Sequence, residues 1–473
     1  MRDHLVFWIN GTRHEVRDET AFTTLSRYLR LDLRATGTKV VCEEGDCGAC
    51  TVLIGRPAGD HLAYRPVNSC IQFLFQLDGV HIITVEGLGP APSPVQESMI
   101  RCHGAQCGYC TPGFVVAMTA LFESNEPLTE ATVKDGLTGN LCRCTGYDPI
   151  VRAAMEVDRA SVQRMDDLYP PRPMLDEMAR AATEEVRIET GGRTFFRPRT
   201  VESAIRFRAE HPGTVILQGG TDLAVLHNKR GIVPRAVLTL DGLDGLDELS
   251  IDNGMLVVGA RVTVSELKAF AEERIPELGR VLEWFGSPQI RNTGTLAGNV
   301  ANASPIADTI PFLMVMGAEV ELAGPNGTRT IDINSFYRAY KTTAAEPGEM
   351  ITRVLVPLPD HDETLKLYRV AKRRHLDIAS FTAAIRMKRT DGSIDRVRIA
   401  YGGVAPVVLR LPKTEAFLSG KRFDLESFES AGELAREEIS PISDVRGSAE
   451  FRSQLAANIL KKFFYESAVP HEA

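Results

Sequence analysis

The chain has 473 residues, of which 44% are hydrophobic and 25% charged, and its net charge at pH 7 is −8. This composition is typical of a soluble globular protein, and the length predicts about three or four domains. No basic patch suits nucleic acid, no apolar stretch is long enough to cross a bilayer, and the apolar run that stops at Asn10-Gly11 is too short for a secretory signal. We therefore expect a cytoplasmic protein with neither a nucleic-acid nor a membrane partner.

The first segment reads as alternating strands and a helix. Leu5–Ile9 is apolar and β-prone, Asn10-Gly11 is a hairpin signal, and Thr12–Val16 is the expected return strand. Leucines and a tyrosine at helical spacing predict a helix over 23–31, and Thr51–Ile54 predicts another strand. This order resembles a ferredoxin β-grasp domain.

All nine cysteines lie in the first third of the chain, which favours metal ligation in a reducing compartment over a disulfide framework. Cys42, Cys47 and Cys50 have the spacing C-x4-C-x2-C, and Cys70 follows at a distance. This is the plant-type ferredoxin pattern for a [2Fe–2S] cluster. Zinc is the alternative, although zinc sites usually combine two short pairs of ligands.

A second group of cysteines follows a linker-like run at 89–94. The pattern then becomes helical, with helix starts predicted at Thr111-Pro112 and Asp148-Pro149. Near those starts lie the pairs Cys107/Cys110 and Cys142/Cys144. Cys102 also completes a C-x4-C-x2-C pattern, so five thiols compete for four ligand positions. The two close pairs suffice without Cys102, so the sequence favours Cys102 as an inert packed thiol over a fifth ligand.

Together these loops resemble the iron–sulfur region of xanthine dehydrogenases and related molybdenum hydroxylases. The motifs that carry the resemblance are the first cysteine loop, the run from His103 to Gly113, and the run from Gly139 to Tyr147. The resemblance implies one [2Fe–2S] cluster on Cys42, Cys47, Cys50 and Cys70. It implies a second on Cys107, Cys110, Cys142 and Cys144, within a helical-bundle domain and without Cys102.

Two further runs predict a ligand site in the second half of the chain. Val215–Gln218 reads as a buried strand that feeds a Gly219-Gly220 turn, which can expose N–H groups to a phosphate or be a plain turn. Residues 285–308 are dense in small and hydrogen-bonding side chains, which predicts a segment wrapped around something polar; a long surface loop is the alternative. There is no G-x-G-x-x-G motif, so a Rossmann site is not indicated.

Both runs resemble the FAD domain of the same family, of the vanillyl-alcohol-oxidase type. The FAD contacts that this resemblance implies are Ile216, Leu217, Gln218, Gly219, Gly220, Thr221, Asp222, Leu223, Phe285, Thr295, Leu296, Ala297, Gly298, Asn299, Asp308, Ile351 and Arg369. Family members often carry lysine where Arg369 stands. Residues 371–378 match a loop that affects NAD access, but their charges can equally be a solvated face.

The expected fold is therefore a multidomain α+β protein. It comprises a β-grasp [2Fe–2S] ferredoxin domain (1–88), a helical-bundle [2Fe–2S] domain (89–160), a linker (161–186), an α+β FAD-binding domain (187–360) and an α+β C-terminal domain (361–473). The C-terminal domain is expected to include a helix over Phe451–Phe464.

The chain as a whole resembles the small, iron–sulfur and FAD subunit of bacterial xanthine dehydrogenases. That implies a molybdopterin-bearing large subunit as partner, commonly in an α2β2 assembly, and oxidation of hypoxanthine and xanthine to urate there. Electrons would pass from the partner subunit to the cluster on Cys107, then to the cluster on Cys42, then to FAD and finally to NAD+. No residue of this chain is expected to act as a general acid or base. The alternatives are the same role in a hydroxylase of aldehydes or N-heterocycles, and a zinc scaffold without catalysis.

Overall fold

The structure is a computed structural model that describes residues 1–89, 92–124 and 126–468. The chain forms two compact units: Met1–Asp244 with Ser287–Gly294, and Gly245–Gly286 with the chain from Thr295 onward. The expected FAD-binding domain thus contributes to both units. Among the described residues, no helix has the length and apolarity needed to cross a bilayer.

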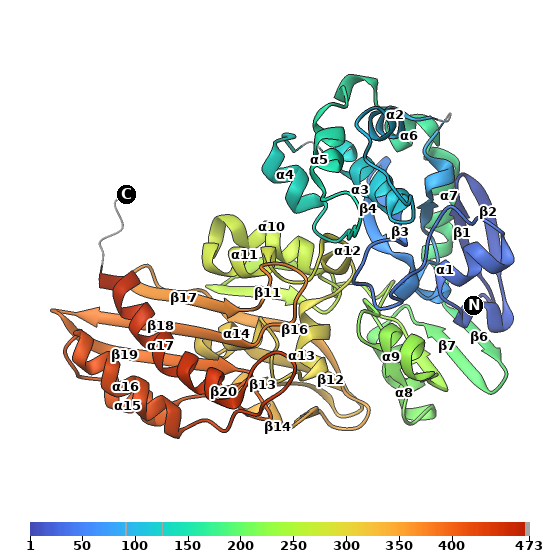
Figure 1. Ribbon diagram of the computed structural model, residues 1–473. Helices are drawn as coiled ribbons and strands as arrows, with labels where there is room; N and C mark the ends of the chain where they lie inside the picture. Colours follow the sequence, from blue (N-terminus) through green and yellow to red (C-terminus); the bar gives the residue numbers. More distant parts are fainter. Residues whose placement is uncertain (90–91, 125, 469–473) are drawn as a thin grey trace. The chain divides into compact units, whose positions relative to one another are not determined.

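The first unit begins with a five-stranded sheet in the order β2-β1-β5-β3-β4, in which β1 and β5 run parallel (Figure 1). Its strands are β1 (Leu5–Ile9), β2 (Thr12–Val16), β3 (Thr51–Ala58), β4 (His61–Asn68) and β5 (His81–Ile83). The predicted hairpin is confirmed residue for residue. The predicted helix over 23–31 consists of a short α1 (Leu25–Arg27) and a π-helical turn (Tyr28–Asp32). Single 3-10 turns lie at Asp18–Phe22, Ser69–Ile71, Leu74–Gln76 and Val85–Gly87.

Helices follow, as expected from the second cysteine segment. They are α2 (Pro94–Arg101), α3 (Thr111–Glu123), α4 (Glu130–Gly136) and α5 (Asp148–Met155). The buried face of α3, including Phe114 and Met118, shares a core with Trp8 and Leu53 of the β-grasp sheet. The linker-like run at 89–94 lies partly outside the described residues; its last residues, Ser93 and Pro94, begin α2 with a capping box.

The expected linker at 161–186 is instead folded. After a 3-10 turn (Arg159–Ser161) it contains α6 (Met165–Leu168) and α7 (Arg172–Ala182), and Met165, Met174 and Met178 are buried in the same core as Phe114. Tyr169 between these helices donates a hydrogen bond to the Gly87 carbonyl, 2.8 Å away. The proline run does not make this segment a free linker, because apolar side chains before and after the run are buried in the core of the first unit.

The first unit ends with a four-stranded sheet in the order β6-β7-β9-β8. Its elements are β6 (Val186–Thr190), β7 (Arg193–Arg197), α8 (Val201–Glu210), β8 (Val215–Ile216), α9 (Leu223–Arg230), β9 (Ala236–Leu238) and, from later in the chain, α12 (Pro288–Arg291). The buried strand predicted at Val215–Gln218 is only two residues long and half-buried, so that prediction is wrong in extent.

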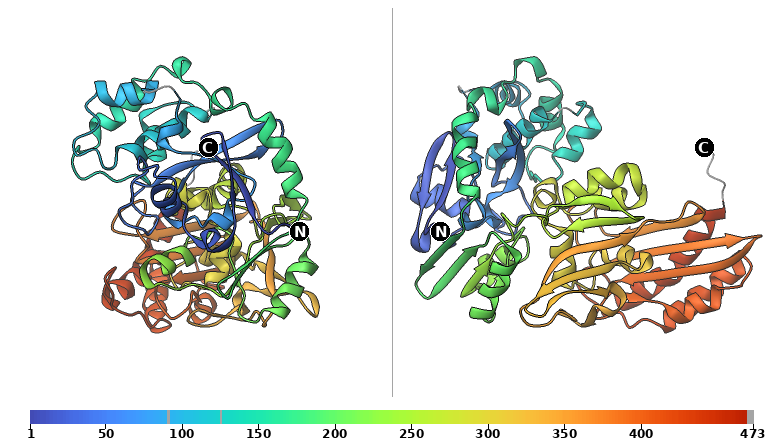
Figure 2. Two further views of the ribbon diagram at one scale, coloured as in Figure 1. Left: turned by 90° about the vertical axis from the view of Figure 1, so that its right-hand side faces the viewer. Right: turned by 180° about the vertical axis from the view of Figure 1, so that it is seen from behind.

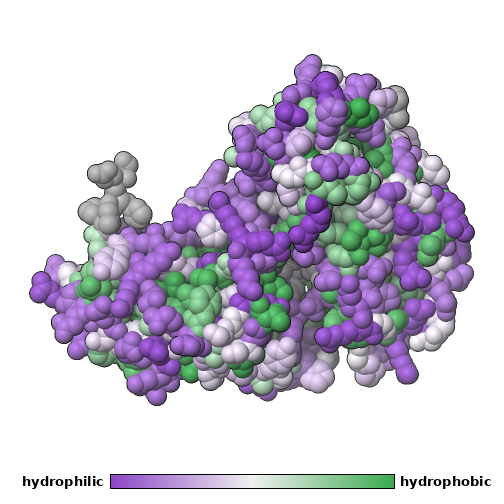
Figure 3. Space-filling model, viewed as in Figure 1, coloured by the Kyte–Doolittle hydropathy of each residue, from purple (hydrophilic) through white to green (hydrophobic). Residues whose placement is uncertain are grey.

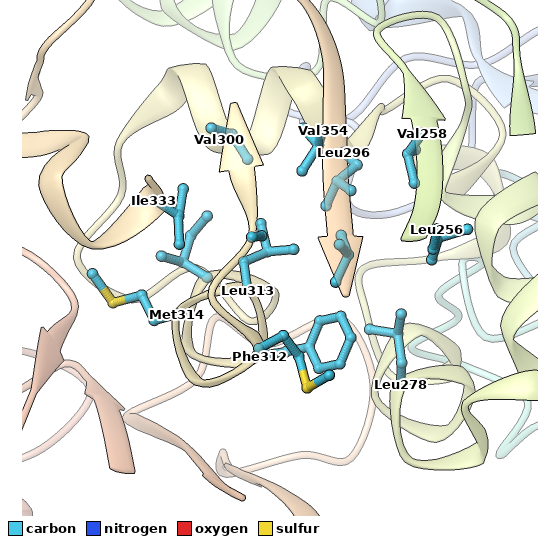
Figure 4. Close-up of a cluster of buried hydrophobic side chains, with 14 of the residues drawn as sticks. Leu256, Val258, Leu278, Leu296, Val300, Phe312, Leu313, Met314, Ile333 and Val354 are labelled. Carbon is cyan, nitrogen blue, oxygen red and sulfur yellow. The ribbon is translucent and has the colours of Figure 1, made fainter. Parts of the chain in front are cut away.

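The second unit contains a five-stranded sheet in the order β10-β11-β16-β12-β13. Its elements are β10 (Leu249–Asp252), β11 (Met255–Gly259), α10 (Val264–Arg274), α11 (Pro276–Glu283), α13 (Leu296–Asn302), α14 (Ile310–Met316), β12 (Glu319–Gly324), β13 (Gly327–Asp332), a 3-10 turn (Ile333–Ser335), β14 (Tyr337–Ala339), β15 (Thr342–Thr343) and β16 (Met350–Pro357). Figure 4 shows its core, in which Leu296 and Val300 of α13 and Phe312 and Leu313 of α14 lie with Val354 of β16.

The same unit ends with a four-stranded antiparallel sheet, β17-β18-β19-β20, backed by helices α15, α16 and α17 (Figures 1 and 2). The bounds are β17 (Glu363–Val370), β18 (Phe381–Thr390), β19 (Ser393–Gly402), β20 (Leu409–Arg410), α15 (Pro412–Leu418), α16 (Leu425–Glu437) and α17 (Ala449–Ala468). The helix expected over Phe451–Phe464 lies within α17. On the face drawn in Figure 3, hydrophobic residues form separate patches among hydrophilic ones, as is normal for a folded protein surface.

Candidate functional site

The four predicted ligands of the first cluster come together in one loop region. The thiol of Cys42 interacts with those of Cys47 and Cys70, and the thiol of Cys50 interacts with that of Cys70. Cys50 and Cys70 are buried, whereas Cys42 and Cys47 are half-buried. The hydrogen bonds from Cys47 and Cys70 hold the pKa of the Cys42 thiol well below its usual range. The donor set is therefore entirely sulfur, and one member favours the thiolate form that ligates metals.

The four predicted ligands of the second cluster also meet, in the loops that precede α3 and α5. Cys107 contacts Cys144, and Cys110 contacts Cys142. Burial opposes ionisation of Cys142, but hydrogen bonds from Thr145 and from the Cys144 amide outweigh it and lower the pKa of this thiol to about 7. Cys107 and Cys144 are exposed, so this sulfur group opens to the surface of the unit.

The arrangement of these sulfurs fits binuclear clusters. Within the described residues, no three or more histidine, cysteine, aspartate or glutamate side chains are gathered as the ligands of a single metal ion would be. Each cysteine group nevertheless supplies four thiols, and a [2Fe–2S] cluster takes two thiolates on each of its irons. Backbone N–H groups also point at sulfur: the Glu44 amide lies 3.4 Å from Cys42 Sγ, and the Cys144 amide lies 3.4 Å from Cys142 Sγ. Such hydrogen bonds are the means by which a protein tunes a bound cluster.

The two cysteine loops are joined directly. The amide of Leu141, next to Cys142, donates to the carbonyl of Cys47 at 2.9 Å, and Nδ2 of Asn140 donates to the Gly48 carbonyl at 2.9 Å. Gly48 has φ of +68°, and a Cβ there would collide with the Gly139 carbonyl oxygen. The two loops therefore approach so closely that only glycine fits at position 48. The hydrogen bond from Leu141 to Cys47 links Cys47, a predicted ligand of the first cluster, to the residue beside Cys142, a predicted ligand of the second.

Helix α12 lies against both loops, a contact that the sequence did not predict. Gln289 is fully buried, and its Nε2 donates to Asn140 Oδ1 at 2.8 Å and lies 3.3 Å from Thr51 Oγ1. Asn292 donates to the Pro66 carbonyl at 2.9 Å. Gln289 and Asn292 of the polar run thus bond to the cluster-binding region, so protein partners and not a ligand account for the polarity of this part.

Helix α9, which follows the Gly219-Gly220 turn, also holds the first cysteine loop. Nδ2 of Asn228 donates to the carbonyls of Cys70 and Glu43, at 2.8 and 3.0 Å, and Lys229 pairs with Glu44 at 2.9 Å. Asn228 therefore ties together the two chain segments that present Cys42 and Cys70. No sequence signal marks it, because an amide side chain on a short helix has many ordinary roles.

We expect Asn228→Leu to loosen the first cluster. The substitution removes two hydrogen bonds and leaves the carbonyl of buried Cys70 without its donor, at a cost of about 2 kcal/mol. Iron should then pass from the first cluster to an added chelator roughly tenfold faster, measured by the decay of visible absorbance. Lys229→Leu is the control, because Lys229 makes an exposed ion pair with the same loop, and exposed ion pairs contribute little to stability. Equal rates in the two variants would refute a role for Asn228.

The predicted flavin contacts divide between the two units. Ile216 to Leu223 belong to the first unit and form a turn after β8; Gly220 has φ of +72°, and a Cβ on Gly219 would collide with the Thr293 carbonyl. Nε2 of Gln76 donates to the Gln218 carbonyl at 2.9 Å. Oε1 of Gln218 is buried and has no hydrogen-bond partner among the described residues. This orphaned acceptor fits a ligand that carries hydroxyl groups.

The remaining predicted contacts, Phe285, Thr295 to Asn299, Asp308, Ile351 and Arg369, belong to the second unit. Thr295 is the N-cap of α13, with its Oγ1 accepting from the Gly298 amide at 3.0 Å, so this part of the polar run is a capped helix and not a long surface loop. Thr309 donates to Asn299 Oδ1 at 2.6 Å. Local hydrogen bonds therefore account for much of the polarity of this run.

Asp308 differs from the other polar residues of this run because its hydrogen-bonding capacity is only partly used. Its carboxylate is buried beside Arg369, with Oδ2 3.1 Å from the guanidinium Nε, while Oδ1 has no partner in the described part of the chain. Burial raises the pKa of Asp308, and Arg369 offsets this only in part. A buried carboxyl oxygen without a partner suits hydrogen bonding to a bound ring system such as a flavin.

The loop at 371–378 is held by its own charges. Asp377 accepts from Nε of Arg373 at 2.8 Å, and Nη1 of Arg369 donates to the Arg374 carbonyl at 3.1 Å. The guanidinium of Arg374 lies 5.2 Å from the ring centre of Trp284. These contacts link the loop to the Asp308–Arg369 pair, and whether it also affects NAD access stays a prediction.

Family models match nearly the whole chain. A 2Fe-2S iron-sulfur cluster binding domain matches residues 7–72, a [2Fe-2S] binding domain 84–155, an FAD binding domain in molybdopterin dehydrogenase 187–359, and a CO dehydrogenase flavoprotein C-terminal domain 366–467. The structure is similar to that of quinoline 2-oxidoreductase from Pseudomonas putida 86, with a TM-score of 0.54 and 30% identity over 57% of this chain and 95% of that one. The chain belongs to the molybdenum hydroxylase family. Within it, this is an iron–sulfur and flavin chain, and the predicted multidomain α+β fold is confirmed.

Proteins of this family that are named for different substrates are about equally similar to this chain. The chain is 31% identical to the xanthine dehydrogenase of Oryza sativa subsp. japonica and 30% identical to aldehyde oxidase 1 of Bos taurus, over 99% and 98% of its length. It spans only 40% and 39% of those two proteins. The carbon monoxide dehydrogenase of Hydrogenophaga pseudoflava is similar in structure, with a TM-score of 0.55 and 26% identity over 57% of this chain and 94% of that one. Similarity alone therefore assigns the family and not the substrate.

Proposed function

We propose that this chain is the electron-transfer subunit of a xanthine dehydrogenase. The observation that carries the proposal is the pair of cysteine groups joined through the Leu141–Cys47 hydrogen bond, in a chain whose remaining length matches flavin-binding models. When bound, the two [2Fe–2S] clusters would carry electrons one at a time, and FAD would collect two of them and pass them to NAD+ as a hydride. The chain's own residues hold and orient these groups.

Each predicted site has residues suited to that role. The four thiols from Cys42 to Cys70 and the four from Cys107 to Cys144 would hold the clusters, with amide N–H groups stabilising the sulfur charge. Asp308 has a buried oxygen that lacks a hydrogen-bond partner among the described residues, and this oxygen would accept a hydrogen bond from the flavin. Arg369 would fix the orientation of Asp308 by the ion pair between them. The partner would be a molybdopterin-bearing subunit, because the two models matched by the second half of the chain are described for a molybdopterin dehydrogenase and a CO dehydrogenase.

Cofactor analysis followed by reconstitution tests the proposal. The purified chain should be brown and contain one FAD. It should also contain about four irons, because each group of four thiolates holds one [2Fe–2S] cluster. Co-purified with its partner, it should reduce NAD+ with xanthine as electron donor. A colourless, zinc-containing protein would refute the cofactor assignment, whereas a brown protein that is inactive with xanthine would refute only the substrate.

A second candidate is the same role in a hydroxylase of aldehydes or N-heterocycles. It is favoured by the equal identity, 30%, to aldehyde oxidase 1 and to quinoline 2-oxidoreductase. The same co-purified complex, assayed with an aldehyde or quinoline in place of xanthine, decides between the two.

A further inference from the structure

Three arginines gather on one face of the C-terminal sheet, and none of them is among the predicted cofactor contacts. Arg386 of β18 and Arg398 of β19 are direct cross-strand partners, and Arg410 stands on the adjoining strand β20, opposite Ala400. Side chains alternate along these strands: Ile385 and Ile399 pack with α15–α17, whereas Ala384 and Ala400 pack in the core that contains α14. Arg386 and Arg398 therefore lie on the α14 side of the sheet.

The three guanidinium groups meet the carboxyl end of α14. Nη1 of Arg410, Arg398 and Arg386 lies 3.4, 3.3 and 3.5 Å from the carbonyl oxygens of Met314, Val315 and Met316 in turn. Cations at this end of a helix are favourable. Helix capping therefore explains part of the cluster, but the contacts are long and each uses Nη1 alone. Nε and Nη2 of Arg386 and Arg410 donate to Glu363 and Glu415, so Arg398 keeps the most donors for another acceptor.

The positive charge of Arg398 is not balanced in the same way as that of its neighbours. Arg386 is paired with Glu363 at 2.5 Å, and Arg410 with Glu415 at 2.7 Å. Arg398 has no carboxylate partner among the described residues. Burial and the neighbouring guanidiniums of Arg410 and Arg386 lower its pKa. Like charges placed directly opposite each other on paired strands destabilise a sheet, so this arrangement costs stability in the free protein.

A cavity of about 500 Å³ opens beside these groups. Its lining includes Gly317, Asp332, Asn334, Arg386, Arg398 and Arg410. Asp332 is the one carboxylate in the lining, and its Oδ1 is already occupied by the backbone amide and the side-chain amide of Asn334, each at 2.8 Å. Donors therefore outnumber free acceptors in this cavity.

We propose that this cavity binds a phosphate group, either as free phosphate or as a phosphate monoester such as a nucleotide. The guanidinium fork of Arg398 matches phosphate oxygens, and an anion would balance the charge of Arg398 beside Arg386 and Arg410. The cavity is larger than phosphate needs and falls in the range of small-ligand pockets, which leaves room for an ester group. The proposal is independent of the electron-transfer function.

Equilibrium dialysis of the cofactor-loaded full chain against radiolabelled phosphate or AMP at low ionic strength tests this site. We expect one phosphate per chain, and a Kd about tenfold higher in Arg398→Gln. Arg396→Gln is the matched control, because Arg396 is exposed, pairs with Glu363 and does not line the cavity. Tighter binding of AMP would identify the monoester as the ligand class, and equal binding would identify free phosphate.

Thermal melting separates this role from helix capping. If Arg398 serves an anion, Arg398→Gln should melt at the same temperature as the wild type or higher without phosphate, and lose the stabilisation that phosphate gives the wild type. No bound phosphate at 10-millimolar concentrations, as an order of magnitude for a weak site, would overturn the proposal. Unchanged binding in Arg398→Gln, with a lower melting temperature at every phosphate concentration, would also overturn it, since Arg398 would then be a helix cap.

Discussion

Gly48→Ala is expected to remove iron from both cluster sites at once. Gly48 lies between Cys47 and Cys50 with φ of +68°, and its missing side chain is the space filled by the Gly139 carbonyl. A left-handed conformation alone costs a non-glycine residue about 1–2 kcal/mol. The collision adds to this, because the obstacle is backbone and the Asn140 Nδ2 atom lies 2.7 Å from the new Cβ. The loops that carry Cys47 and Cys142 must then separate.

Iron analysis of the purified variant measures the effect, and we expect more than half of the iron to be lost. Gly59→Ala is the matched control: Gly59 has φ of +74° in the turn between β3 and β4, and a Cβ there would meet nothing within 4 Å. It carries the same backbone strain without the collision, so it should keep its iron. If both variants retained the same amount, the close approach of the two loops would not be what holds the sites.

The parts of the fold that the sequence predicts well are those set by local rules. The hairpin β1–β2 follows from a turn dipeptide between two short β-prone runs, and the starts of α3 and α5 follow from Pro112 and Pro149, which fit only the first turn of a helix. The cysteine groups are also local, because ligand spacing reflects the geometry of a metal cluster rather than the fold around it.

The predictions that failed concern segments whose structure depends on distant partners. Residues 161–186 look like a linker because Tyr169–Pro173 is proline-rich, yet Met174 and Met178 are buried against helices far away in the sequence. The polar run from 285 looks like a ligand-wrapping loop, yet Gln289 satisfies Asn140, 149 residues earlier. A hydrogen bond between residues so far apart in the chain cannot be predicted from residue spacing in a single sequence.

The same reason explains why the residues that hold the cysteine loops in place were missed. Asn228 and Gln289 are ordinary amide side chains on short helices, and their importance lies in the carbonyl and amide groups that they reach. A metal ligand can be recognised by its chemistry, whereas a residue that positions a ligand can be recognised only by its neighbours.

Cys144→Ser should halve the iron content, whereas Cys102→Ser should leave it unchanged. Cys144 is exposed and contacts Cys107, so its sulfur is available to a cluster, and a serine oxygen is a poor substitute for a thiolate. Cys102 is buried, with its Sγ 3.2 Å from Glu156 Oε2 and 4.0 Å from Ser98 Oγ. Serine can keep the hydrogen bond to Glu156, so we expect a cost in stability below about 1 kcal/mol.

Iron per chain, measured together with low-temperature EPR, distinguishes the outcomes. Cys144→Ser should fall from about four irons to about two and lose one of two EPR signals, because each [2Fe–2S] cluster needs four thiolates. Retention of both signals would exclude Cys144 as a ligand. A loss of iron in Cys102→Ser equal to that in Cys144→Ser would make Cys102 a ligand, and the pairing of Cys107 with Cys144 and of Cys110 with Cys142 would then not be the one that holds the second cluster.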